Sequence, residues 1–222
     1  MSTESPPERT SATTDIPILY EDAELLVIDK PAGLAVHPGP RTPHSLEDHL
    51  PDLRFGYHRL PQPTHRLDRD TSGCLVLARN PKALKRLNAL FAAGEVEKTY
   101  HALLAGRIEG EGTIDAPLLK VSTKETGWRM TVDARGKPAT THWRVLETGD
   151  QSLVEFRPKT GRTHQIRIHA AHALAPIVGD PVYGEEDGHL MRLRAVAIGF
   201  SWRGGRSVAV EAPPQAFLPP TT

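Results

Sequence analysis

The sequence predicts a mixed α+β fold, and three observations support this class. Segments with strand character outnumber helical ones, short turns join most neighbouring strands, and strands do not alternate regularly with helices. The sequence contains no internal repeat, no Walker loop and no Gly-x-Gly-x-x-Gly motif. The βαβ architecture of dinucleotide-binding proteins is therefore not expected.

The predicted strands are short apolar or alternating runs that end at polar, Gly or Pro residues. They cover residues 18–20, 25–28, 74–78, 98–105, 140–146, 152–157, 195–202 and 207–210. Tight turns are expected at residues 21–24, 149–150 and 204–205, so the strands on either side should pair as hairpins. Residues 30–33, Lys-Pro-Ala-Gly, are expected to end the second strand.

The predicted helices cover residues 45–50, 81–93 and 163–173. The first lies within a Pro- and His-rich loop, residues 34–64, with Ser45 as its N-cap. In the second, Pro81 suits the first turn and Gly94 the C-terminal end. Its buried face is expected to carry Leu84, Leu87 and Phe91.

Length and composition indicate one globular domain between two tails. The 222 residues include 38% hydrophobic and 24% charged residues, which is ordinary for a globular protein. Residues 1–15, rich in Ser, Thr, Pro and Glu, predict a disordered tail, residues 16–215 the folded domain, and residues 216–222 a C-terminal tail. The formal net charge is zero, so the bulk charge of the chain gives no evidence for a nucleic-acid partner.

Cysteine usage and hydropathy predict a cytoplasmic location without membrane attachment. Cys74 is the only cysteine, so no intramolecular disulfide can form, and its apolar neighbours predict a buried structural thiol. No stretch approaches the ~20 apolar residues of a membrane span, and the N-terminus lacks the apolar region of a secretory signal.

Residues 65–73, His-Arg-Leu-Asp-Arg-Asp-Thr-Ser-Gly, contain the strongest candidate for catalysis. Asp68 lies between Arg66 and Arg69, and nearby positive charge favours an ionised carboxylate. Such a carboxylate can act as a base or as a nucleophile, and the motif alone does not decide between them.

A second cluster, residues 159–169, is rich in arginine and histidine. A solvated basic face is the simplest interpretation of such a run. Gly161 and the interleaved Ile166 and Ile168 instead favour an arrangement in which some arginines point inward, where they need a carboxylate or phosphate partner. The 11 histidines include no His-Glu-x-x-His motif and there is no Cys pair, so no metal site is predicted.

Four segments in order resemble the RluA-type RNA pseudouridine synthases. They are the opening hairpin, the motif around Asp68, a Lys-Thr-Tyr motif and the arginine motif with the loop that follows, at residues 18–37, 65–73, 98–100, and 159–169 with 179–184. The resemblance covers nearly everything after the N-terminal tail. It implies a pseudouridine-synthase-type fold, in which a mixed, largely antiparallel sheet has flanking helices and a central catalytic cleft.

The resemblance also implies roles for individual residues. Asp68 would be the catalytic aspartate, either attacking the ribose C1′ to form an ester or abstracting a proton to give a glycal. Tyr100 would pack on the target base, and Arg167 would pair with Asp68. Arg66 would fill the space left by the flipped nucleotide, since a base inside a duplex must leave the stack before it can react. The remaining base- or RNA-binding residues would be Arg162, His164 and Ile166, with Ile166 as an apolar floor.

The activity implied by the resemblance is isomerisation of specific uridines to pseudouridine in rRNA or tRNA stem-loops. The reaction changes no redox state and transfers no external group, so no cofactor is expected. The partner would be RNA and the protein a monomer. Two departures from the family pattern stand out: residues 1–15 are too short for an S4-type RNA-binding domain, and Leu193-Arg194-Ala195 replaces the usual Leu-His-Ala.

Two other classes of function stay open at this point. One is a non-catalytic RNA-binding module that keeps the fold, although such a module does not need a carboxylate facing phosphates. The other is a hydrolase that uses Asp68 and Asp70 as an acid pair. In the isomerase interpretation, Arg69 and Asp70 only support the turn, and Tyr100 taken alone is also typical of a core aromatic.

Overall fold

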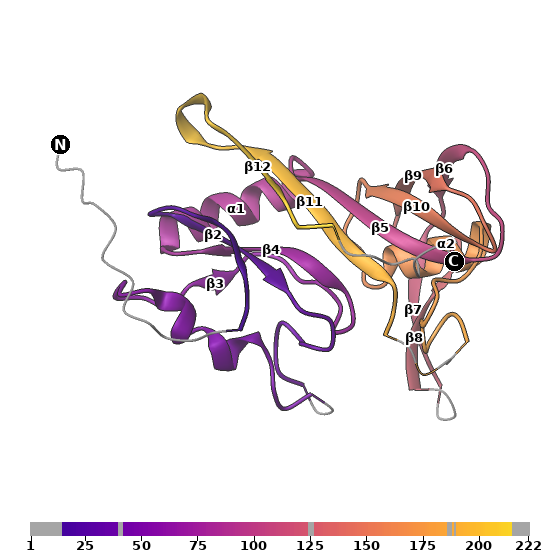
Figure 1. The fold of residues 1–222 in the computed structure, drawn as a ribbon, viewed down its shortest axis with the longest axis horizontal. Helices are drawn as coiled ribbons and strands as arrows, with labels where there is room; N and C mark the ends of the chain where they lie inside the picture. The colour runs from indigo at the N-terminus through magenta and orange to yellow at the C-terminus, as the bar shows by residue number, and fades with distance from the viewer. Residues whose placement is uncertain (1–14, 40–41, 124–126, 186–187, 189, 215–222) are drawn as a thin grey trace. The chain divides into compact units, whose positions relative to one another are not determined.

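The computed structural model describes residues 15–39, 42–123, 127–185, 188 and 190–214 (Figure 1). The predicted tails, residues 1–15 and 216–222, lie outside these ranges except for Asp15. The chain divides into two compact units, unit 1 (Met1–Val96 and Ala197–Ala212) and unit 2 (Glu97–Val196 and Pro213–Thr222). The single domain expected over residues 16–215 stays a prediction.

Unit 1 is built on antiparallel strands. The hairpin of β1 (Ile18–Glu21) and β2 (Leu25–Lys30) continues to β4 (Ser72–Ala78), and the two-residue β3 (Gln62–Pro63) also pairs with β4. The second half of β11 (Leu193–Ser201) pairs with β12 (Ser207–Glu211). Every residue of β4 is buried, which fits its unbroken apolar sequence.

Helix α1 (Pro81–Ala93) follows β4 and packs against it (Figure 1). The side chain of Asn80 caps its first turn by accepting the Ala83 N–H at 2.9 Å. Gly94 ends the helix in the left-handed region, with φ 73°, where a side chain would be strained. Two 3₁₀ helices, η1 (Leu46–His49) and η2 (Asp52–Arg54), lie in the loop before β3, and η3 (Arg203–Gly205) lies between β11 and β12.

Unit 2 contains a second set of antiparallel strands. Their order is β11, β5 (Glu97–Ala105), β10 (Gln151–Pro158), β9 (Thr140–Glu147) and β6 (Glu111–Asp115). A separate hairpin is formed by β7 (Leu118–Thr123) and β8 (Gly127–Val132). Helix α2 (Gln165–Ala173) packs against β8 and β10. The mixed, mostly antiparallel α+β class predicted from the sequence is confirmed.

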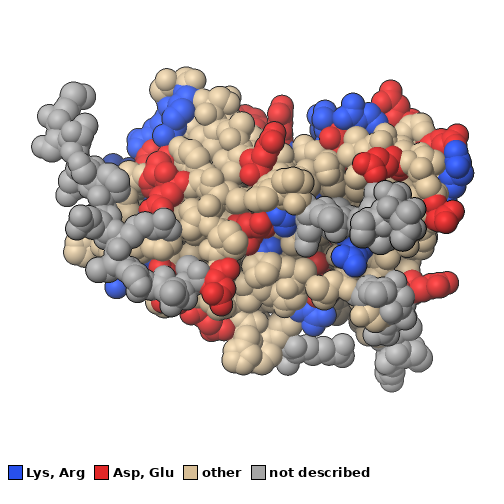
Figure 2. Space-filling model, in the orientation of Figure 1, with Lys and Arg blue, Asp and Glu red and all other residues tan. Residues whose placement is uncertain are grey.

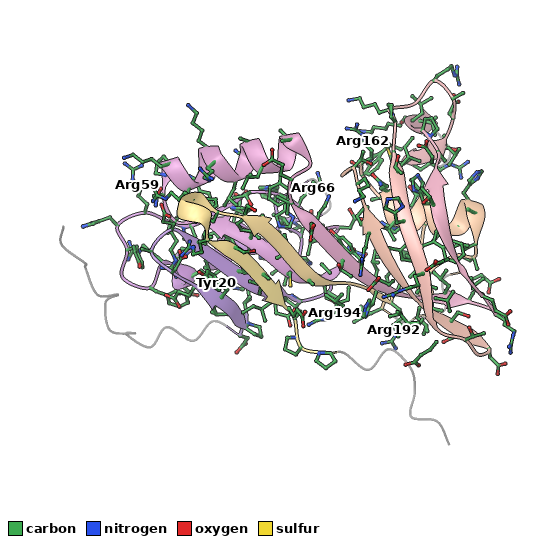
Figure 3. The ribbon with its side chains drawn as sticks, turned by 90° about the horizontal axis from the view of Figure 1, so that it is seen from above. Tyr20, Arg59, Arg66, Arg162, Arg192 and Arg194 are labelled. Carbon is green, nitrogen blue, oxygen red and sulfur yellow. The ribbon has the colours of Figure 1, made fainter. Side chains whose placement is uncertain are left out.

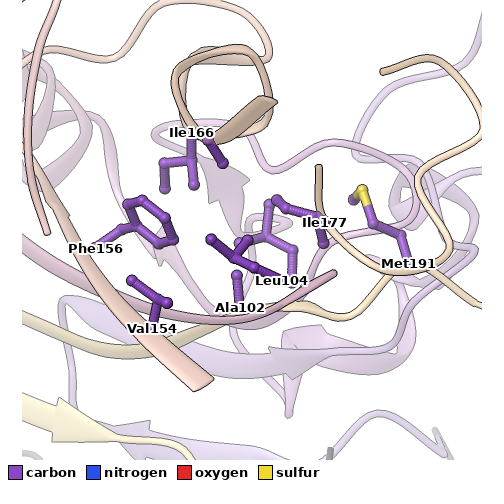
Figure 4. Close-up of a cluster of buried hydrophobic side chains, with 9 residues drawn as sticks. Ala102, Leu104, Val154, Phe156, Ile166, Ile177 and Met191 are labelled. Carbon is purple, nitrogen blue, oxygen red and sulfur yellow. The ribbon is translucent and has the colours of Figure 1, made fainter. Parts of the chain in front are cut away.

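The core of unit 2 lies between α2 and the β5–β10 pair. Its buried members are Ala102, Leu104, Val154, Phe156, Ile166, Ala170, Ile177, Met191 and Leu193. Figure 4 shows Ile166 pointing from α2 toward Phe156 of β10. Because residues of one strand face point the same way, Ala102 and Leu104 reach this cluster together.

All eight predicted strands and the three expected hairpin turns are present, but several details of the prediction are wrong. Strands β3, β6, β7 and β8 were not predicted, nor was η2. Helix α2 begins at Gln165 and not at Thr163, because His164 is in the left-handed region with φ 54°. The buried face of α1 carries Ala83, Leu87 and Leu90. Phe91 lies at its edge, where the ring stacks on His65 at 4.6 Å.

Other local predictions are confirmed. The helix near Ser45 is η1, and Ser45 caps it by accepting the Glu47 N–H while Asp48 accepts the Ser45 N–H. Cys74 is buried with 1% of its surface exposed, as expected of a structural thiol.

Candidate active site

The loop that carries Asp68 is fixed at both ends within unit 1. At its start, the His65 ring stacks on Phe91, and its Nε2 accepts the Val76 N–H at 3.0 Å. At its end, the Thr71 N–H donates to the Asp68 carbonyl at 3.1 Å and closes a turn just before β4. Leu67 is buried, and Asp68 is half-buried. The sequence pattern thus becomes a short, anchored loop that presents a carboxylate.

A buried lysine stabilises this loop through hydrogen bonds to backbone carbonyls. Lys30, at the end of β2, is fully buried and donates from Nζ to three carbonyl oxygens, those of Pro31 at 2.8 Å, Leu34 at 2.7 Å and Arg69 at 3.0 Å. The Gly33 N–H donates to the same Arg69 carbonyl at 2.9 Å. Burial lowers the pKa of Lys30 to about 8, and the charges of Asp70 and Asp68 oppose that fall.

Sequence reasoning missed the role of Lys30 and treated residues 30–33 only as the end of a strand. The available signal was a lysine directly after an apolar run, followed by Pro and Gly. A buried ammonium needs acceptors, and the carbonyls of the turn supply them.

The two arginines that flank Asp68 are both exposed. Arg66 is exposed on the loop before β4 (Figure 3). Arg69 donates from Nε and Nη2 to the two carboxylate oxygens of Asp70 at 2.9 and 3.1 Å. This pair fits the expectation that Arg69 and Asp70 support the turn.

In unit 2, the side chain of Gln165 organises the turn that leads into α2. Its Oε1 accepts from the Thr160 hydroxyl at 2.6 Å and from the Arg162 N–H at 3.0 Å. Its Nε2 donates to the Thr140 carbonyl at 3.0 Å and to the Thr141 hydroxyl at 2.9 Å. Four hydrogen bonds from one buried amide therefore hold the turn against β9.

Arg167 points inward, as the sequence indicated, and is 5% exposed. It donates from Nε and Nη2 to the two oxygens of Asp180, each at 2.7 Å, in a bidentate pair. Asp180 is fully buried and also accepts the N–H groups of Val182 and Tyr183. Burial alone would raise the pKa of Asp180, but the Arg167 guanidinium and the two N–H groups hold it below its usual value.

Asp180 is a residue that sequence reasoning did not assign. The loop at residues 179–184 was part of the resemblance, but the expected partner of Arg167 was Asp68. The bidentate pair with Asp180 explains how α2 holds Arg167 inside unit 2. Pairing of Arg167 with Asp68 stays a prediction.

The structure brings Tyr100 and Ile166 to the same apolar cluster. Tyr100 lies on β5 directly opposite Phe156 of β10 and packs, half-buried, against the core that contains Ile166. Arg162 is exposed, and its Nε donates to the Pro138 carbonyl at 3.0 Å (Figure 3). His164 Nδ1 lies 3.0 Å from the Tyr183 hydroxyl.

The departure at Arg194 has a structural explanation. Arg194 is 5% exposed, and its Nη2 donates to the Pro213 carbonyl at 3.2 Å. The guanidinium thus ties β11 to the segment after β12 within unit 2. This contact is consistent with a structural role for the position.

Within the described residues, no group of three or more His, Cys, Asp or Glu could hold a metal ion. No helix in that part of the chain is long and apolar enough to cross a membrane. On the face shown in Figure 2, acidic and basic side chains are interspersed.

The model of one protein family, RNA pseudouridylate synthase, matches residues 24–172. The chain belongs to this family. The match includes the Asp68 loop, Tyr100 and α2 with Arg167. The protein is therefore an RNA pseudouridine synthase, an isomerase class that converts uridine to pseudouridine in RNA.

Two relatives show how far the similarity extends. An uncharacterized RNA pseudouridine synthase of Zymomonas mobilis is 50% identical over 207 residues, which cover 90% of this chain and 94% of that protein. The ribosomal large subunit pseudouridine synthase D of Yersinia pestis is 40% identical over 185 residues. That alignment covers 78% of this synthase and 54% of the Yersinia protein, so this chain matches about half of that relative's length.

Solved structures of two human proteins share the fold of this synthase. RNA pseudouridylate synthase domain containing 1 superposes with a TM-score of 0.77 at 30% identity, over 95% of this chain and 88% of that one. RNA pseudouridylate synthase domain containing 4 superposes with a TM-score of 0.75 at 25% identity, over 90% and 89%. These matches confirm the pseudouridine-synthase-type fold predicted from the sequence.

Proposed function

We propose that this synthase isomerises specific uridines in structured RNA, in stem-loops of rRNA or tRNA, and that Asp68 is its catalytic carboxylate. The observation that carries the proposal is the anchored loop, in which Lys30, His65 and Thr71 fix the backbone around a half-buried Asp68. The Yersinia relative is named for the large ribosomal subunit, which favours rRNA as the substrate.

The chemistry explains the residue types. The N1–C1′ bond of uridine breaks, the uracil turns over, and C5 bonds to C1′ while C5 loses its proton and N1 gains one. In both routes considered for Asp68, the ester and the glycal, the reacting group is an ionised carboxylate. No oxidant and no external group enter this balance.

The other residues are proposed to hold the RNA and the detached base. Tyr100 packs on the uracil from the edge of the apolar cluster, and Ile166 lies beneath it as a floor. The guanidinium of Arg167 supplies positive charge for Asp68, and Arg66 fills the gap left when the nucleotide flips out. Arg162 and His164 are proposed to contact the RNA. The central cleft, the monomeric state and the cytoplasmic location are proposed with these roles.

Tritium release from RNA labelled at C5 of uridine tests the proposal. Asp68→Asn should abolish release and leave RNA affinity within about tenfold of wild type, because the substitution removes the reacting charge but keeps the side-chain volume. Asp70→Asn is the matched control, since Asp70 carries the same charge two residues away and pairs with Arg69. It should retain release.

The same assay, together with mass spectrometry of the treated RNA, separates the other functions. Full turnover by the Asp68→Asn variant would refute the assignment of the carboxylate. RNA binding by wild type without tritium release would favour a binding module. A hydrolase would give products of altered mass, whereas pseudouridine formation leaves the mass of the RNA unchanged.

A further inference from the structure

Three aromatic rings form a row in unit 2, and two of them, Trp128 and Tyr183, have no role in the proposed function. The row runs from Trp128 on β8 to His164 at the start of α2, with ring centroids 5.3 Å apart, and on to Tyr183, 5.6 Å from His164. The guanidinium of Arg167 lies 5.1 Å from the Tyr183 ring. The row therefore connects an outer strand of unit 2 with the buried arginine of α2.

Trp128 is exposed at the outer end of this row. Its exposed fraction is 49%. Among the large hydrophobic side chains that are exposed within the described residues, Trp128 is the one with an aromatic ring. By contrast, Trp202 is 3% exposed and Trp143 is half-buried against the core. Because about half of this indole stays exposed to water, packing in the core does not by itself explain a large aromatic side chain at this position.

The hairpin holds Trp128 in a fixed position. Trp128 and Met130 project from the same face of β8, because they are two residues apart on a strand. Met130 is buried against Ile168 of α2, and its N–H donates to the Tyr183 hydroxyl at 3.1 Å. The anchored half of the hairpin thus orients the exposed half before any ligand binds.

A cation lies beside Trp128. Lys120 of β7 lies with its Nζ 4.9 Å from the indole ring, whereas Arg129 projects from the other face of β8. His164 faces the ring from α2. A protein-binding patch would be expected to surround the ring with apolar side chains, whereas a ring beside a lysine ammonium suits a base attached to a phosphate.

We propose that Trp128 is a stacking platform for an unpaired nucleotide of the substrate RNA and that Lys120 binds the adjacent phosphate. This inference rests on the proposed function, because it assigns a further RNA contact to the same synthase. Lys120 is long and exposed, so its ammonium can move from the ring to a phosphate when a base occupies the ring face. Trp128 is then a positioning residue that acts on substrate binding.

Intrinsic fluorescence with an octauridylate probe tests the stacking directly. A base stacked on an indole quenches its emission, so wild type should lose emission when octauridylate is added. Trp128→Phe keeps an aromatic face but leaves only Trp143 and Trp202 to emit, so it should bind the probe without quenching. Inorganic polyphosphate should compete with octauridylate for Lys120 and cause no quenching itself.

Steady-state kinetics on the full-length RNA substrate provides the second readout. Trp128→Ala should raise KM between roughly fivefold and a hundredfold, the range expected for loss of one base–aromatic stack, and leave kcat within about twofold. Trp128→Phe should restore most of the KM. Leu146→Ala is the matched control, because Leu146 is an exposed apolar residue of the same unit, and its KM should equal that of wild type.

The outcomes distinguish this inference from the proposed function. Tritium release by wild type with an unchanged KM in Trp128→Ala would overturn the platform and leave the function intact. Quenching that is lost in Trp128→Phe, in a protein that releases no tritium, would support the platform and refute the function. A fall in kcat at constant KM, or no quenching of wild type, would also overturn the platform. Melting curves that match wild type show that each variant is folded.

Discussion

The pair between Arg167 and Asp180 gives a stability prediction that can be worked out from its geometry. Substitution of Asp180 by Asn keeps the volume of the side chain but removes the charge that faces the guanidinium. Arg167 would then remain buried with its main partner neutralised. Removing one member of a buried ion pair costs about 3–5 kcal/mol, so the free energy of unfolding should fall by that amount.

This fall is large compared with the total stability of a typical domain, about 5–15 kcal/mol. Urea unfolding followed by far-UV circular dichroism measures it, and a double-mutant cycle with Arg167→Met isolates the interaction. Because Arg167→Met removes the charge that faces Asp180 in wild type, the two substitutions together should cost less than the sum of their separate effects. We expect a coupling energy of at least about 1.5 kcal/mol.

An exposed pair of equal length serves as the control. Asp133 and Arg135 also approach to 2.7 Å, but Arg135 is 80% exposed, so Asp133→Asn should change stability little. Because the folded pKa of Asp180 is lowered, its contribution is present above its ordinary value of 3.8 and is lost as the pH falls through the folded pKa. The difference between wild type and Asp180→Asn should therefore shrink below pH 4. Additive substitutions, or equal effects at Asp180 and Asp133, would refute the argument.

Two further predictions concern the backbone around the site. Because burial lowers the pKa of Lys30 from 10.5 to about 8, the unfolded chain binds more protons than the folded chain between these two pH values. The stability of wild type relative to Lys30→Met should therefore rise between pH 8 and 10.5, by no more than about 3 kcal/mol. Urea titrations at several pH values measure this difference, and a difference that stays constant would contradict the pKa shift. A Cβ at Gly136 would overlap the backbone carbonyl group of Leu118, so Gly136→Ala should lower the free energy of unfolding by about 1–3 kcal/mol. At Gly161 an added Cβ would meet nothing within 4 Å, so Gly161→Ala should have the same melting temperature as wild type. Equal melting temperatures of the Gly136→Ala and Gly161→Ala variants would refute the steric argument.

Much of the fold could be predicted because its local signals are strong. Strand β4 is an unbroken apolar run, and α1 carries Pro81 at its start and Gly94 at its end. Residues 111–132 lack such signals, since β6 to β8 expose much of their surface and alternate only weakly. Their stability comes from pairing with β9 and from packing on α2, which are contacts between residues far apart in the sequence.

The candidate site shows the same division. The inward orientation of Arg167 could be inferred from Ile166 and Ile168, because apolar residues directly before and after it indicate a helix that is buried on more than one side. Its partner Asp180 and the role of Lys30 could not, since both depend on loops that fold against distant strands. The left-handed conformation of His164 was missed for a related reason: the turn in which it lies is held by hydrogen bonds of Gln165, one of which reaches Thr140 on a distant strand.

The path of β11 has a consequence for synthesis on the ribosome. Its residues 193–196 belong to unit 2 and its residues 197–201 to unit 1, so the chain returns to unit 1 in the middle of a strand. Unit 1 therefore cannot be completed until all of residues 97–196 have been translated, whereas the strands and helix of unit 2 emerge consecutively. Since domains generally fold as units while the chain grows, the nascent β2–β4 pair must wait with an unfinished sheet until β11 and β12 leave the exit tunnel.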